Sequence, residues 1–172
     1  MGLDCYIVHG NDRDKAFTHK DDERIKDVSL CGGMLSGGGS DGSFRGKVYE
    51  PLIDELMQHD GGIWHKTEHD NPPYVTSDEL KAQADVLEEF LHTVREEYGV
   101  SGSDPNHTNC PLDIDDDTIV YQVKDLTEYT LGEVKDLMTL LRVASERRAV
   151  RLLINNIKEN YYDRRIYKSR RF

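Results

Sequence analysis

The segment from Cys31 to Lys47 holds seven glycines in seventeen residues, and no other feature constrains the fold of this 172-residue chain as strongly. Glycine destabilises helices and strands, because it loses more backbone freedom on folding than any other residue. The segment therefore predicts a long irregular loop between regular elements. Loops of this length in compact domains are commonly functional.

The residues on either side of this loop have the periodicity of regular structure. Alternating apolar residues predict a strand over residues 3–8, and a short apolar run predicts a second strand over 28–31. Helical spacing predicts a helix over residues 48–57, with Pro51 near its first turn and Asp60-Gly61-Gly62 at its end.

Two capping boxes predict the starts of further helices. Thr76 with Glu79 begins a helix that runs to about Tyr98, and Thr130 with Glu133 begins another. A capping box satisfies two backbone amides at once, because each side chain accepts a hydrogen bond from the other residue's N–H.

The rest of the chain completes the expected fold. β-Branched residues predict a strand over 118–123, and apolar spacing predicts a helix over 147–162, with a short strand at 150–154 as the alternative. The predicted fold is α+β, a small mixed β-sheet layered with three to four helices in a single domain spanning residues 1–172. Its last part is a basic aromatic segment, residues 161–172.

Charge is distributed unevenly along the chain. The net charge is −11, but residues 142–172 carry ten Lys/Arg against three Asp/Glu, which leaves a net −18 on residues 1–141. The acidic body should repel nucleic acid, whereas the basic end could either attract it or dock on the body itself; we expect no nucleic-acid partner. We also expect a cytoplasmic protein without a membrane partner, because no apolar run reaches the roughly 20 residues of a membrane span and the first residues do not resemble a signal peptide.

The glycine-rich loop is the main candidate site. We expect an anion, such as the phosphate of a small molecule, to be held by backbone amides and by the polar and basic side chains among them. The predicted ligand-binding residues are Gly37, Gly38, Gly39, Ser40, Gly42, Ser43, Arg45 and Lys47. The alternative is a loop in which the glycines only supply positive φ angles.

Known phosphate-binding motifs do not match this loop. Gly37-x-Gly39-x-x-Gly42 has the spelling of the dinucleotide fingerprint, but five more residues precede the helix-like segment. A P-loop reading fails because Gly42 and Gly46 are separated by three residues rather than four, and Val48 stands where a hydroxyl would bind magnesium.

Two other segments resemble metal sites. His65, Glu68 and His69 have the spelling of an inverted zinc-protease motif, and His107 with Cys110 offers two more ligands. A solvated polar loop is the favoured interpretation of these residues. The acidic run 113–117 resembles the start of a calcium loop but lacks its glycine and its final glutamate.

The three cysteines, Cys5, Cys31 and Cys110, are odd in number and widely spaced, which predicts reduced thiols. Cys5 and Cys31 lie in apolar strand-like context, where a thiol is usually inert, so no nucleophile is expected.

Three stretches of the first 60 residues resemble a family of small uncharacterised bacterial and phage proteins that begin Met-Gly-Leu-Asp-x-Tyr. They are Met1-Gly-Leu-Asp-Cys-Tyr6, Leu30-Cys-Gly-Gly-Met34 and Gly42-Ser-Phe-Arg-Gly-Lys-Val-Tyr49. The resemblance implies no activity. A phage origin would fit a protein that sequesters a nucleotide signal without turning it over.

Three functions follow as hypotheses. The first is a binding protein for a nucleotide or cyclic-nucleotide-like molecule, with no catalytic residues. The second is an acidic interaction or inhibitor module for a basic partner, and the third is a metal-dependent hydrolase. In the tail, Tyr161, Tyr162, Ile166, Tyr167 and Phe172 are too apolar for a solvated end, which predicts that it packs on the body or on another copy in a homo-oligomer.

Overall fold

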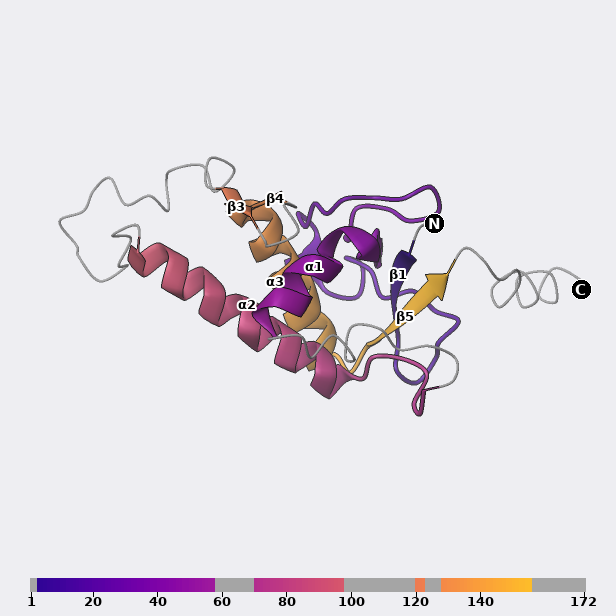
Figure 1. The fold of residues 1–172 in the computed structure, drawn as a ribbon. Coiled ribbons are helices and arrows are strands. Elements are labelled where there is room, and N and C mark those ends of the chain that lie inside the picture. The colour runs from indigo at the N-terminus through magenta and orange to yellow at the C-terminus, as the bar shows by residue number, and fades with distance from the viewer. Residues whose placement is uncertain (1–2, 58–69, 98–119, 123–127, 156–172) are drawn as a thin grey trace, which may run out of the picture.

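The fold is built around strand β1 (Leu3–Val8), which lies at the centre of a three-stranded antiparallel sheet. The computed structural model describes residues 3–57, 70–97, 120–122 and 128–155 (Figure 1). β2 (Ser43–Phe44) pairs with one edge of β1 and β5 (Val150–Asn155) with the other. The register aligns Cys5 with both Phe44 and Leu153, so the first and last described segments are neighbours.

A second, two-stranded antiparallel sheet joins β3 (Val120–Gln122) to β4 (Glu128–Thr130). The α+β class is confirmed, but every strand pair among the described residues is antiparallel, where a mixed sheet was expected. Among the described elements, no α-helix separates β1 from β2 or β3 from β4, so neither pair has the helical crossover that parallel strands usually need.

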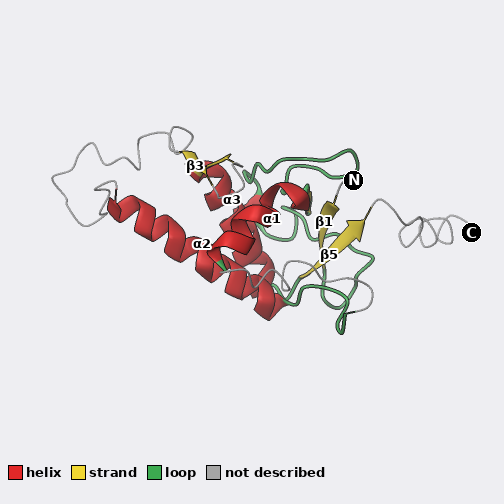
Figure 2. Ribbon diagram, in the orientation of Figure 1, coloured by secondary structure: helices red, strands yellow, loops and turns green. Residues whose placement is uncertain are grey.

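Three α-helices accompany the sheets in the described part of the chain: α1 (Gly46–Leu56), α2 (Ser77–Glu97) and α3 (Leu131–Glu146). A 3₁₀ turn, η1 (Glu23–Ile25), lies in the long connection after β1. α2 and α3 pack along one another, while α1 contacts β1 and α2 contacts β5 (Figure 2).

Both predicted capping boxes are present. At α2, the Glu79 amide donates to Thr76 Oγ1 over 3.2 Å and the Thr76 amide donates to Glu79 Oε2 over 2.8 Å. At α3, the Glu133 amide donates to Thr130 Oγ1 over 3.1 Å and the Thr130 amide returns to Glu133 Oε2 over 3.2 Å. These local signals therefore fixed both helix starts correctly.

One hydrophobic cluster joins the sheet to the helices. Tyr49 of α1 is fully buried between Phe44 and Tyr129, with ring centroids 5.9 Å and 6.1 Å away. The Tyr129 hydroxyl donates to the carbonyl of Val48 over 2.5 Å. β4 and α1 are thus held against the edge of the sheet, directly behind the glycine-rich loop.

Two predicted elements in the first 60 residues differ from the structure. Residues 28–31 form no strand; Ser29 makes one isolated bridge to Gly39, and its amide donates to Asp136 instead. Pro51 lies inside α1, which begins at Gly46 rather than Val48. The predicted end of that helix, residues 60–62, lies outside the described residues.

The predicted helix over 147–162 is wrong in its first part, and the strand alternative holds. α3 ends at Glu146, Arg148 takes a left-handed φ of 54°, and β5 then pairs with β1 along all six of its residues. Pairing with a strand nearly 150 positions earlier supplies hydrogen bonds that helical spacing in the local sequence cannot reveal.

Candidate functional site

The glycine-rich loop is held by its own internal hydrogen bonds. The amide of Gly37 donates to Ser43 Oγ over 2.8 Å, that of Gly39 to the Ser43 carbonyl over 2.8 Å, and that of Gly42 to the Gly39 carbonyl over 2.9 Å. Ser43 is buried, and its hydroxyl donates to Asp41 Oδ1 over 3.0 Å. These three glycine amides therefore serve the loop rather than pointing at a ligand.

Two of the loop glycines are required by backbone conformation. Gly39 and Gly42 have φ angles of 100° and 82°, a region that side chains disfavour. A Cβ at Gly42 would also collide with the carbonyl oxygen of Phe17. The Gly42 carbonyl accepts the Ile7 amide over 2.6 Å, so this glycine ties the loop to β1.

Of the remaining predicted residues, Gly38 and Ser40 bond to the preceding segment of the chain, and Arg45 and Lys47 lie at the start of α1. The carbonyl of Ser40 accepts the amide of His19 over 2.8 Å, and the carbonyl of Gly38 accepts that of Leu30 over 2.7 Å. Arg45 and Lys47 lie at the start of α1, where the Arg45 amide donates to the Cys31 carbonyl over 2.8 Å.

The start of α1 is electrostatically unlike those of the other two helices. Arg45 is the N-cap residue and makes no capping bond with its side chain, and the first turn carries Lys47 but no acid. α2 has two acids in its first turn, and α3 has one. Cations at the positive end of a helix are unfavourable by about 0.3–1 kcal/mol each, so the start of α1 favours an anionic ligand more than the starts of α2 and α3 do.

Tyr49, one turn into α1, connects the loop to α3. Its hydroxyl accepts the Cys31 amide over 2.7 Å and donates to Glu133 Oε1 over 3.3 Å. Burial raises the pKa of Tyr49 well above its usual value, so the hydroxyl stays protonated and remains a donor. Sequence reasoning missed this link, because 84 positions separate Tyr49 from Glu133.

The opposite end of the loop forms a tight turn at residues 33–36. The Gly33 amide donates to the Ser36 carbonyl over 3.1 Å, and Ser36 Oγ donates to Asp4 Oδ1 over 2.8 Å. The Tyr6 hydroxyl donates to the Leu35 carbonyl over 2.8 Å. β1 thus braces a turn whose Met34 and Leu35 side chains are 93% and 63% exposed.

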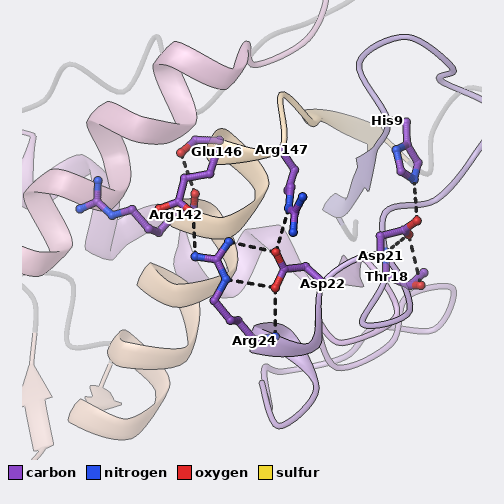
Figure 3. A network of polar contacts seen from close by, with 9 residues as sticks. His9, Thr18, Asp21, Asp22, Arg24, Arg142, Glu146 and Arg147 are labelled. Atoms are coloured by element: carbon purple, nitrogen blue, oxygen red, sulfur yellow. Dashed lines mark hydrogen bonds and ion pairs between the residues drawn. The ribbon is translucent and has the colours of Figure 1, made fainter.

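A second polar network links η1 to the end of α3 (Figure 3). Arg24 contacts both carboxylate oxygens of Asp22, at 3.0 Å from Nε and 2.9 Å from a terminal nitrogen, and its other terminal nitrogen lies 2.6 Å from Glu146 Oε2. Hydrogen bonds from Arg24, and next to them one from Arg147, hold the pKa of Asp22 far below its usual range. The carboxylate is satisfied by arginines, which assigns it a structural role.

A third group of polar residues is fully buried behind the sheet. The Arg151 guanidinium donates to Gln83 Oε1 over 3.0 Å, and Val75 exchanges both backbone hydrogen bonds with Arg151 over 3.0 Å. Burial raises the pKa of the Cys5 thiol to about 12 and lowers that of Arg151 to about 10. Cys5 therefore stays a thiol, as expected, whereas Cys31 is exposed and not buried in a strand as predicted.

The predicted metal ligands His65, Glu68, His69, His107 and Cys110 all lie outside the described residues, as do residues 113–117 and the segment 161–172. Within the described ranges, no three His, Cys, Asp or Glu side chains come together as a metal site would require. The hydrolase hypothesis stays a prediction from sequence.

No protein-family model, curated protein or solved structure matches the chain. Among the described residues, no helix combines the length and the apolar character needed to cross a lipid bilayer.

Proposed function

We propose that the protein binds an anionic, phosphate-bearing small molecule, such as a nucleotide or cyclic nucleotide, at the start of α1. The observation that carries this proposal is the position of two cations at that helix end, with Arg45 as the N-cap residue and Lys47 in the first turn. Arg45 would make paired hydrogen bonds to phosphate oxygens, and Lys47 would add a point charge.

The internal hydrogen bonds of the loop change which groups would hold the ligand. The amides of Gly37, Gly39 and Gly42 are engaged within the loop, so we place the phosphate on the basic side chains and the helix end instead. Tyr49 and its bond to the Cys31 amide would hold α1 and the loop in a fixed relation, which limits the ordering needed on binding.

The test is a thermal-shift panel of nucleoside mono-, di- and triphosphates and cyclic dinucleotides, with sodium sulfate as a simple anion. A ligand at 100 times its Kd adds about 2.7 kcal/mol of stability. For a chain of this size, that is a rise in Tm of about 5–10 °C. Arg45→Ala and Lys47→Ala should each reduce the shift, and Arg45→Lys should restore only part of it.

The matched control is Lys26→Ala, which removes an exposed cation at the end of η1 that is not among the predicted site residues. It should leave the ligand-induced shift unchanged. If no member of the panel moves the Tm, or if the shift survives in Arg45→Ala and Lys47→Ala, the proposed site is wrong.

A further inference from the structure

The exposed turn at residues 33–36 is the strongest feature that the proposed function leaves unused. Met34 and Leu35 are the exposed large hydrophobic residues of the described chain, and they are adjacent. Single exposed apolar residues are ordinary, but a braced pair has a fixed shape that another apolar surface can cover at little entropic cost. The contacts from Tyr6 and Asp4 beneath it supply that bracing.

The strand register shows where the chain leaves the sheet relative to this turn. β5 ends at Asn155, which is paired with Leu3 of β1. Asp4, the next residue along β1, is paired with Ile154 and holds Ser36 of the turn through its carboxylate. The described part of β5 therefore ends beside the strand end of β1 that supports Met34 and Leu35.

The composition of residues 156–172 is suited to covering this turn. The segment carries six Lys/Arg against two Asp/Glu, while residues 1–141 carry a net −18, so the two attract. It also holds six large apolar or aromatic residues, which are Ile157, Tyr161, Tyr162, Ile166, Tyr167 and Phe172. Because the segment is tethered beside the turn, its effective concentration there is on the order of millimolar, which favours it over a separate partner.

We propose that residues 156–172 fold back in cis and cover Met34 and Leu35. This contact would give the basic aromatic segment its place on the acidic body, independently of any ligand at α1. The contact needs no second copy of the chain, and it predicts that the turn and the segment protect each other.

The test uses the full-length chain and two reciprocal variants. In Met34→Ser/Leu35→Ser, hydrogen–deuterium exchange within residues 156–172 should become about tenfold faster or more. In Tyr161→Ser/Tyr162→Ser/Ile166→Ser/Tyr167→Ser, the rate of Met34 oxidation by hydrogen peroxide, measured by peptide mass spectrometry, should rise about fivefold or more. Met138, partly buried in α3, serves as the internal reference and should oxidise at an unchanged rate.

Three outcomes would overturn the proposal. The first is exchange in residues 156–172 that does not respond to Met34→Ser/Leu35→Ser, and the second is Met34 oxidation that does not respond to the tail variant. The third is protection that depends on protein concentration together with a dimer mass by light scattering, which would assign the cover to a second copy. Changes in both reciprocal measurements at constant monomer mass support docking in cis.

Discussion

Arg147 Nε donates a hydrogen bond to Asp22 Oδ2 over 2.9 Å, joining two residues 125 positions apart. Arg24 holds both oxygens of the same carboxylate and also pairs with Glu146, so two acids attach the long connection after β1 to the end of α3 (Figure 3). The Asp22 side chain is only 5% exposed, although both arginines are half exposed.

Replacing Asp22 by Asn should lower the free energy of unfolding at pH 7 and have a smaller effect at pH 3. We expect Asp22→Asn to lower the free energy of unfolding by about 1–2 kcal/mol at pH 7, a modest value because water screens the half-exposed arginines. The pKa of Asp22 is depressed on folding, so its contribution is present above its unfolded pKa of about 3.9 and is lost as pH falls below that value. Urea titrations at pH 7, 5 and 3 should therefore show the difference from wild type shrinking toward pH 3.

Asp27→Asn is the control for this experiment, because it removes an exposed carboxylate close to η1 in sequence. It should change stability by less than about 0.5 kcal/mol at each pH. A difference between Asp22→Asn and wild type that is constant from pH 7 to pH 3 would contradict the structural role of the charged network.

The glycine-rich loop predicts a contrast between two substitutions. Gly42→Ala should lower the Tm by about 4 °C or more, because Gly42 has a φ of 82° and its new Cβ would meet the Phe17 carbonyl. Gly38→Ala should cost much less, since its Cβ would lie 3.4 Å from the Leu30 carbonyl, an ordinary contact. Equal Tm values for the two variants would show that the loop does not have this conformation.

The two described cysteines should differ sharply in reactivity. Cys31 is exposed, whereas the Cys5 thiol is fully buried with its pKa raised to about 12 by burial. In a Cys110→Ser background at pH 8, iodoacetamide should label Cys31 in the native protein and Cys5 only after unfolding. Comparable native labelling of both thiols by mass spectrometry would contradict the buried position of β1.

At the start of α1, we expect one substitution to raise the stability of the ligand-free protein and to abolish ligand binding. Arg45→Asp supplies a side-chain cap and places an acid at the positive end of α1, whose first turn has none, so the ligand-free protein should gain about 0.5–1 kcal/mol. The same change should abolish the thermal shift from any phosphate ligand, because it places a carboxylate where the phosphate would lie. If the variant is stabilised but still binds the phosphate ligand, the proposed anion site is wrong, although the expected effect of the helix cap is confirmed.

Short-range signals predicted much of the fold. Thr76 with Glu79 and Thr130 with Glu133 placed two helix starts, because a capping box involves residues only three apart. Alternation likewise identified β1. In the candidate site, the sequence identified the glycine-rich loop and its two cations, but it did not show that the glycine amides of the loop bond to one another.

The sequence by itself determined the class of the fold, the extent of β1 and the caps of α2 and α3, since these depend on neighbours within a few residues. The tertiary structure decided the rest. Residues 150–155 became a strand because β1 offered six residues of antiparallel pairing, and Arg151 is buried because that register aligns it with Ile7. Local periodicity carries no record of such partners, so residues with helical apolar spacing in the sequence form the edge strand of a sheet.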